Sequence, residues 1–366
     1  MREYALVLLT AFATTYLLAG LCRRLALQTG AVAKVRDRDV HAVPIPYFGG
    51  LAMLGGTAAA FLLAAQLPFL GRLAVVRNDS AAILVAGAVI CLVGVLDDML
   101  DLPASVKAAG QVLAAGIVVL YGVRMFWIAL PNRIIVLDTA TSVLITVIFI
   151  FLCVNAINFV DGLDGLASGV VAIGSLAFFS YTYLLAHEQD LVLATTASLV
   201  TVTIGGVCLG FLPHNYFPAR MFMGDSGAML LGLLMAASTL SLTGQVDSAA
   251  LSARGGGLLP SYLPIILPFA IMALPFLDLV LAYARRTRAG TWWFVADKNH
   301  LHHRLLQRGH SQVRACLLMY LWTAVLSFGV VAVGVSQRWW VLVLVLLVAA
   351  VAAWLTWAVP HRRTRA

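Results

Sequence analysis

The chain carries a polar stretch, Asn155-Ala-Ile-Asn-Phe-Val-Asp-Gly-Leu-Asp-Gly165, at the end of the uncharged run 139–160. An ionised Asp at the centre of a bilayer costs about 2.5 to 3.5 kcal/mol, so polar groups at the edge of a membrane span are typical of catalysis, transport or ligand binding. A simpler interpretation is that Asp161 and Asp164 only cap and turn the chain before the next helix. By itself the stretch indicates a site without defining its chemistry.

Two further acidic groups could hold a cation. Asp97 and Asp98 are adjacent, and adjacent carboxylates repel unless positive charge lies nearby. Asp225 lies between glycines in Phe222-Met-Gly-Asp-Ser-Gly. Such a carboxylate suits Mg²⁺, which prefers one or two carboxylates plus substrate phosphate, although each group could also be a helix cap.

Three histidines, His300, His302 and His303, stand beside Arg304. A solvated loop has little structural use for three histidines within four residues. A zinc site is the weaker interpretation, because no Cys or second His pair is near in the sequence. Imidazole and guanidinium donors suit a diphosphate, whose charge must be neutralised as the bond to the leaving group breaks.

The elements that must position these groups are membrane helices. The chain has 366 residues, of which 62% are hydrophobic and 11% charged, and its mean hydropathy is +0.96. This composition indicates an integral membrane protein, and we predict an all-α, polytopic chain with one domain, 1–366. Eleven runs without Lys, Arg, Asp or Glu are long enough, or nearly so, to cross about 30 Å of hydrocarbon at 1.5 Å per residue. They are 4–22, 40–71, 80–96, 108–123, 139–160, 165–187, 191–219, 226–246, 255–277, 315–337 and 339–361.

Most of the Lys and Arg fall in one set of loops, which the positive-inside rule assigns to the cytoplasm. These loops are about 22–46, 97–107, 155–164, 212–225 and 285–315, and the tail after 361 joins them. All the polar clusters described above lie on this side. Basic residues beside anionic lipid account for the net charge of +8, so no nucleic-acid partner is needed. On the outer side, segment 124–138 is predicted to form a small hairpin.

The motifs together resemble the polyprenyl-phosphate N-acetylhexosamine-1-phosphate transferases, glycosyltransferase family 4. The resemblance extends from about His41 to His310 and rests on the motifs quoted above, in this order along the chain. Within the family, Asp297-Lys-Asn-His-Leu-His-His-Arg is more similar to the branch that uses UDP-GlcNAc. The branch that uses UDP-MurNAc-pentapeptide carries three consecutive histidines instead.

The resemblance implies roles for individual residues. Metal ligands for Mg²⁺, or Mn²⁺ in its place, are Asp225 as the principal ligand, with Asp98 and Asp161. Catalytic positions are Asp97, Asp98, Asp161, Asp164, His300, His302 and His303, with Asp97 orienting or deprotonating the lipid phosphate. Substrate-binding positions are His41, Asn155, Asn158, Asn215, Phe222 and Arg304, with Phe222 stacking on uracil.

The expected reaction transfers GlcNAc-1-phosphate from UDP-GlcNAc to a polyprenyl phosphate at the cytoplasmic face of a bacterial plasma membrane. A homodimer is compatible with these features. Two alternatives stay open at this point: a phospho-MurNAc-pentapeptide transferase of the same family, and an ion-coupled transporter. The transporter is disfavoured because the acidic clusters lie at one membrane face and no inverted repeat is evident.

Overall fold

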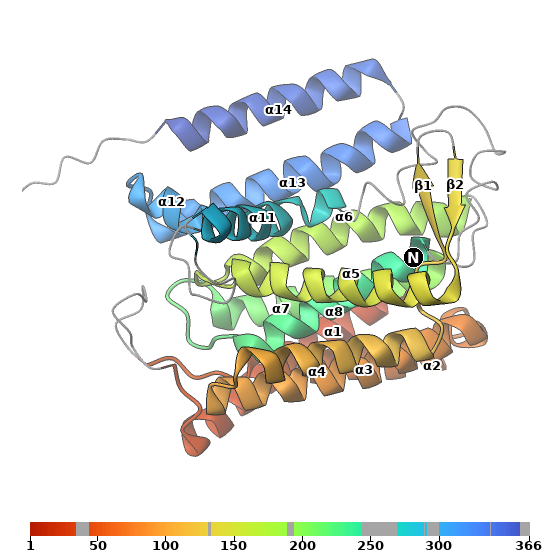
Figure 1. The fold of residues 1–366 in the computed structure, drawn as a ribbon, viewed down its shortest axis with the longest axis horizontal. Helices are drawn as coiled ribbons and strands as arrows, with labels where there is room; N and C mark the ends of the chain where they lie inside the picture. Colours follow the sequence, from red (N-terminus) through yellow and green to blue (C-terminus); the bar gives the residue numbers. More distant parts are fainter. Residues whose placement is uncertain are drawn as a thin grey trace, which may run out of the picture.

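A computed structural model describes residues 1–33, 44–130, 133–188, 194–243, 269–288, 290, 300–336 and 338–358 (Figure 1). The described chain is a bundle of long helices with one small hairpin. The elements in chain order are α1 (Arg2–Thr29), α2 (Gly49–Gln66), the short 3₁₀ helix η1 (Leu70–Arg72), α3 (Ala74–Leu100), α4 (Ala104–Leu120), β1 (Trp127–Leu130), β2 (Arg133–Val136), α5 (Thr139–Val160), α6 (Leu166–Glu188), α7 (Ala194–Asn215), α8 (Gly224–Thr243), α11 (Ala273–Arg288), α12 (Leu301–Gln307), α13 (Gln312–Ser336) and α14 (Trp339–Trp357).

The prediction of a polytopic all-α membrane protein is confirmed. Within the described part of the chain, nine helices are long and apolar enough to cross a membrane, and α4 is a shorter apolar helix. Each predicted run coincides with a described helix except 255–277, most of which lies outside the described residues. The total of eleven spans therefore stays a prediction.

The uncharged run 40–71 is longer than its helix, because the run overlaps the predicted loop of about 22–46. Its helix, α2, begins only at Gly49, and Pro46 instead forms an isolated antiparallel bridge with Val32. Prolines at positions 44 and 46 explain the difference, because a residue before proline is pushed out of the helical region. A run without charged residues therefore indicates apolar composition, but it does not show where the helix begins.

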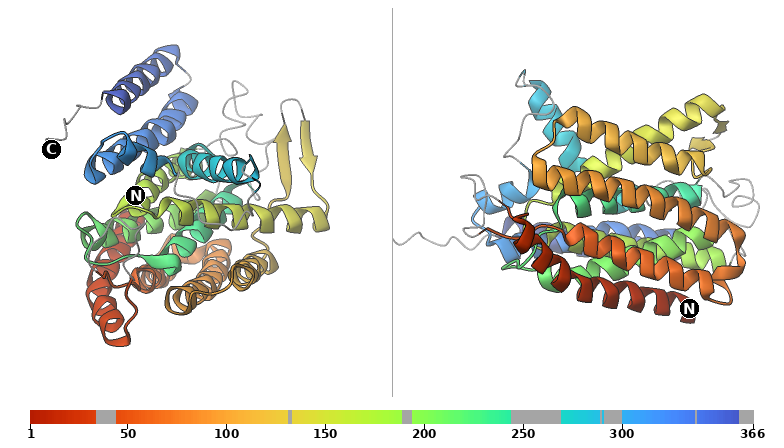
Figure 2. Two further views of the ribbon diagram at one scale, coloured as in Figure 1. Left: turned by 60° about the vertical axis from the view of Figure 1, so that its left-hand side comes forward. Right: turned by 90° about the horizontal axis from the view of Figure 1, so that it is seen from below.

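Helices α7 and α8 form the centre of the bundle. In their apolar windows 89% and 94% of residues are buried, against 11% in α14, which lies at the edge of the bundle (Figures 1 and 2). Close approach of the helices to α8 depends on small residues, as is common in membrane bundles. A Cβ added at Gly94 of α3 would lie 2.3 Å from the Ser226 Cα.

The two ends of the bundle differ in character. The predicted hairpin is confirmed: β1 pairs antiparallel with β2, with Trp127 opposite Val136, at the right-hand end of the bundle in Figure 1. Helix α12 lies at the other end. All five cysteines are free; Cys22 is partly buried and the other four are buried.

Candidate active site

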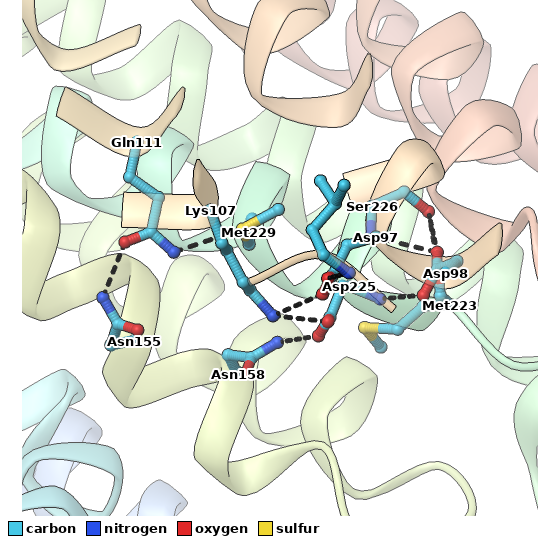
Figure 3. Close-up of polar contacts among 11 residues, drawn as sticks. Asp97, Asp98, Lys107, Gln111, Asn155, Asn158, Met223, Asp225, Ser226 and Met229 are labelled. Carbon is cyan, nitrogen blue, oxygen red and sulfur yellow. Dashed lines mark hydrogen bonds and ion pairs between the residues drawn. The ribbon is translucent and has the colours of Figure 1, made fainter. Parts of the chain in front are cut away.

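Asp98, at the carboxyl end of α3, caps α8 from another helix. Its Oδ1 accepts a hydrogen bond from the Asp225 backbone N–H at 2.8 Å. Its Oδ2 accepts from the Ser226 N–H at 3.3 Å and from the Ser226 hydroxyl at 3.0 Å (Figure 3). Gly224 permits this approach, since its φ is +69° and an added Cβ would lie 2.3 Å from the Asp98 carboxylate. Both oxygens of Asp98 thus bind the first turn of α8, where helix N–H groups lack partners within the helix.

Asp97, the neighbouring residue, belongs to a different contact. The Lys107 ammonium, from α4, donates to Asp97 Oδ2 at 2.8 Å and also to Asp225 Oδ2. Asp225 Oδ1 accepts a hydrogen bond from the Asn158 amide, and Asp97 Oδ1 accepts from the Leu102 N–H at 2.9 Å. Figure 3 shows the two carboxylates converging on one ammonium. The side chains of Asp97, Lys107 and Asp225 are 11%, 19% and 28% exposed, so the bridge is largely buried but reaches the surface.

A second row of amides lies one helical turn behind this bridge. Asn155 donates at 2.8 Å to Gln111 Oε1, and Gln111 donates to the Met229 sulfur at 3.3 Å (Figure 3). Since Gln111 follows Lys107 by four residues and Asn155 precedes Asn158 by three, each helix presents both residues on one face. The row joins α4, α5 and α8 and so holds the bridge residues in register.

The turn between α5 and α6 is held by Asp164 and Asn215. Asp164 Oδ2 accepts from the Ala219 N–H at 2.9 Å. Asn215 accepts from the Gly165 N–H and the Ser168 hydroxyl, each at 3.1 Å, and donates to the Met221 carbonyl at 3.1 Å. These bonds use the side chains within the protein and position the turn. The substrate contacts predicted for Asp164 and Asn215 stay predictions.

Asp161, at the end of α5, lies in negative surroundings. Burial, followed by the charges of Asp225, Asp98 and Asp164, raises the pKa of Asp161 to about 8. The Lys107 ammonium pairs with two carboxylates of this region, Asp97 and Asp225. The donor set of carboxylate oxygens with excess negative charge fits a hard divalent cation. Among the described residues no group of three or more His, Cys, Asp or Glu is gathered as a ligand cluster, so the protein offers two converging carboxylates to such an ion.

The histidine cluster lies against the same turn. His302 is 2% exposed, and a Cβ added at Gly162 would lie 2.4 Å from its Nε2. Burial, followed by the neighbouring His303 and His300, lowers the pKa of His302 to about 3, so this ring is neutral. His300 lies 5.5 Å from the Phe159 ring between centroids, and His302 and His303 are 4.3 Å apart. The structure therefore brings the predicted histidines to the Asp161–Gly165 turn, with His302 as the buried member.

The remaining predicted residues have different outcomes. Phe222 lies in the loop before α8, where its N–H donates to the Pro46 carbonyl at 2.9 Å and its ring lies 6.4 Å from that of Tyr47. Arg304 is an exposed residue of α12. His41 lies outside the described residues. The uracil contact of Phe222 stays a prediction.

Lys107 and Asp278 are functional candidates that sequence reasoning missed. Neither residue belongs to a motif that the sequence analysis used. A signal for Lys107 was present, because Lys107 and Gln111 lie on one face of a helix that starts shortly after the Asp97-Asp98 pair. Asp278 lies 22 residues before His300, with no motif joining the two.

Fold and site together define a multi-pass membrane protein with a carboxylate-rich polar site at one end of its bundle. The chain matches the family model described as Glycosyl transferase family 4 over residues 80–243. A Mycobacterium tuberculosis protein named decaprenyl-phosphate N-acetylglucosaminephosphotransferase is 48% identical over 334 residues, 90% of this chain and 82% of the relative. A Bacillus subtilis protein named probable undecaprenyl-phosphate N-acetylglucosaminyl 1-phosphate transferase is 31% identical over 328 residues, 89% of this chain and 84% of the relative.

An Escherichia coli protein named undecaprenyl-phosphate alpha-N-acetylglucosaminyl 1-phosphate transferase is 27% identical over 354 residues, 93% of this chain and 87% of the relative. The chain therefore belongs to glycosyltransferase family 4, in the group that contains these polyprenyl-phosphate GlcNAc-1-phosphate transferases. The family expected from the sequence motifs is confirmed.

Proposed function

We propose that the protein transfers GlcNAc-1-phosphate from UDP-GlcNAc to a membrane polyprenyl phosphate, giving polyprenyl-diphospho-GlcNAc and UMP. Family membership and the names of the relatives support this reaction. In the structure, the observation that carries the proposal is the convergence of Asp97 and Asp225 on Lys107 at a helix end. Such a site holds both charge signs that a diphosphate and its counterion require.

The position of the site suits two unlike substrates. One substrate is water-soluble and polyanionic, whereas the other keeps its tail in lipid and its phosphate at the headgroup level. A site at the ends of membrane helices admits both. We propose that this end faces the cytoplasm, because most Lys and Arg of the chain lie in the loops on this side.

We propose that Asp97 and Asp225 hold a Mg²⁺ ion, whose positive charge would favour the ionised form of Asp161 nearby. Asp97 and Asp225 are preferred because an oxygen of each already meets a cation, the Lys107 ammonium, whereas Asp98 accepts hydrogen bonds from the start of α8; its predicted ligand role stays a prediction. Mg²⁺ commonly binds one or two carboxylates together with substrate phosphates, and Mn²⁺ suits the same ligands. When bound, the ion would withdraw charge from the diphosphate oxygens.

The residues of the chain then have separate tasks. An oxygen of the lipid phosphate forms a bond to the β-phosphorus of UDP-GlcNAc, and the bond from that phosphorus to the oxygen shared with the α-phosphorus breaks. UMP leaves with the shared oxygen and its electron pair. Asp97 orients the lipid phosphate or accepts its proton, and Lys107 offsets negative charge between the two carboxylates. His300, His303 and Arg304 donate hydrogen bonds to the departing phosphate.

The test uses the purified full chain in detergent with Mg²⁺ and a polyprenyl phosphate. Labelled UDP-GlcNAc and labelled UDP-MurNAc-pentapeptide are supplied in parallel, with decaprenyl and undecaprenyl phosphate as acceptors. We expect label in the lipid fraction from UDP-GlcNAc only, and better use of decaprenyl phosphate, which the more similar relatives are named for. Label from the second donor alone would assign the chain to the MurNAc-pentapeptide reaction, and label from neither would refute the transferase proposal.

The EDTA-treated enzyme gives the metal test. We expect no turnover after chelation and recovery on addition of Mg²⁺ or Mn²⁺. Turnover that persists without a divalent cation would refute the assignment of Asp97 and Asp225 as ion ligands. The predicted homodimer is independent of this assay and stays a prediction.

A further inference from the structure

Asp278 lies away from the carboxylates of the proposed metal site and binds the start of the histidine segment. It belongs to α11, is 1% exposed, and uses both carboxylate oxygens. Oδ1 accepts from the Leu301 backbone N–H at 2.9 Å, and Oδ2 lies 2.9 Å from His300 Nδ1. Helices α11 and α12 lie at the same end of the bundle, where the start of α12 meets α11 (Figure 1).

Capping the start of α12 does not by itself require an aspartate at position 278. A neutral Asn or Ser accepts a hydrogen bond from a helix N–H as well as Asp does, and burying a carboxylate is costly unless it is paired and hydrogen-bonded. His300 is the ion-pair partner that the described structure gives to Asp278. The charge is therefore best explained by the imidazole, because a carboxylate at one ring nitrogen fixes the tautomer and the orientation of a histidine.

The two oxygens match two donors. The Leu301 N–H must donate, since a backbone amide nitrogen has no acceptor role. The second oxygen, accepting at His300 Nδ1, requires a proton on that nitrogen. Nε2 is then the nitrogen left for other partners, as an acceptor in the neutral ring and as a donor in the imidazolium.

Neighbouring rings hold the same orientation of His300. Its ring is parallel to that of His302, with 3° between the planes and 5.7 Å between centroids. On another side it lies 5.5 Å from Phe159, whose ring also carries the Arg286 guanidinium at 5.4 Å. Arg286 follows Asp278 by eight residues and so lies on the same face of α11. Helix α11 thus meets the histidine segment both directly and through Phe159.

We propose that Asp278 is a positioning residue for the transfer reaction: it keeps the His300 Nδ1 protonated, so that Nε2 faces the diphosphate of the sugar nucleotide and donates a hydrogen bond to it when the ring is the imidazolium. This inference rests on the function proposed above. Asp278 acts through His300 and touches no substrate itself. It also explains why a short histidine helix can hold its geometry beside the turn that carries Asp161.

Asp278→Asn tests the proposal with little change of shape. Asn has one oxygen and one NH₂ in place of two oxygens, so either Leu301 loses its acceptor or His300 must accept at Nδ1 and carry its proton on Nε2. We expect kcat to fall about 10- to 100-fold, the usual range for loss of an orienting carboxylate, with the KM for UDP-GlcNAc changing less than about threefold. Asp278→Glu should recover part of kcat.

Histidine ¹⁵N NMR of the full chain in detergent gives a readout independent of activity. The His300 signals are assigned by their loss in His300→Gln and are read at pH 8.5, where a free imidazole is neutral. We expect the Nδ1-protonated form in the wild type and the Nε2-protonated form in Asp278→Asn. The matched control is Asp138→Asn, since Asp138 also accepts two backbone N–H bonds, from Ala140 and Thr141, at the start of α5. Neither the His300 tautomer nor kcat should change in this control.

A double-mutant cycle separates positioning from a structural role. If Asp278 acts through His300, adding Asp278→Asn to His300→Gln should lower kcat less than about twofold further. An equal loss in both backgrounds would overturn the proposal, as would an Nε2-protonated His300 in the wild type. If the wild type transfers no label, the proposed reaction fails, while the NMR result still decides the role of Asp278. If Asp278→Asn does not fold, Asp278→Glu takes its place in the cycle with the same expectation.

Discussion

Asp225→Asn is the substitution whose effect can be derived most directly from the contacts. Asp225 accepts from the Lys107 ammonium with one oxygen and from the Asn158 amide with the other. Asn is nearly the same size but replaces one oxygen by NH₂. Whichever way the new amide turns, one donor of the pair, Lys107 or Asn158, faces another donor.

The expected loss has two sources. A hydrogen bond to a charged group contributes about 1.5 to 3 kcal/mol, and part of this is lost to solvent because the Asp225 side chain is 28% exposed. Removal of one charge contact in a transition state typically lowers kcat by about 10² to 10³. Because Asp225 is also a proposed cation ligand, we expect a decrease in kcat of about 10² or more.

The assay measures transfer of labelled GlcNAc to decaprenyl phosphate as a function of UDP-GlcNAc and Mg²⁺ concentration. A thermal unfolding curve of each variant shows whether the fold is kept. Asp138→Asn is the control, because it removes a charge from a helix cap that accepts from Ala140 and Thr141, outside the site. A folded Asp225→Asn enzyme with kcat within threefold of the wild type at saturating Mg²⁺ would refute the role assigned to Asp225.

Three further predictions follow from the same geometry. Asp98→Asn should lower the free energy of unfolding by about 1 kcal/mol more than Asp97→Asn, because Asp98 caps the start of α8, whereas Asp97→Asn should mainly lower kcat. The reverse order in thermal unfolding would contradict this division. Gly162→Ala should lower turnover at least fivefold, since its Cβ would lie 2.4 Å from His302 Nε2. The control Gly116→Ala should leave turnover unchanged, because its Cβ would have no neighbour within 4 Å. Equal turnover in the two variants would show that His302 moves freely. Burial holds the pKa of His302 near 3, below the unfolded value of 6.5, so the native state binds fewer protons. The stabilising contribution of neutral His302 is therefore fully present above pH 6.5, and the free energy of unfolding should fall by about 2 kcal/mol between pH 6.5 and 5. In His302→Asn this pH-dependent loss should disappear from the unfolding curves.

Much of the architecture could be predicted from local sequence. Hydropathy over a window of about 20 residues identifies a membrane helix without reference to its neighbours, and α5, Thr139–Val160, coincides with its predicted run. The short hairpin was also predictable, because alternating apolar residues and a proline define it locally. The predicted loop of about 22–46 ends close to the start of α2 at Gly49, although the uncharged run itself starts at 40, because hydropathy does not register the effect of Pro46 on backbone geometry.

The sequence by itself determined the protein class, the order of the motifs and the family, because spans and motifs are local patterns. Tertiary structure alone decided which carboxylate does what. Asp97 and Asp98 are adjacent and chemically identical, yet successive helical residues point about 100° apart, so one meets Lys107 and the other meets α8. Asp278 likewise finds His300 only because the start of α12 meets the side of α11. Such contacts depend on the rotation and depth of each helix in the bundle, which no single segment encodes.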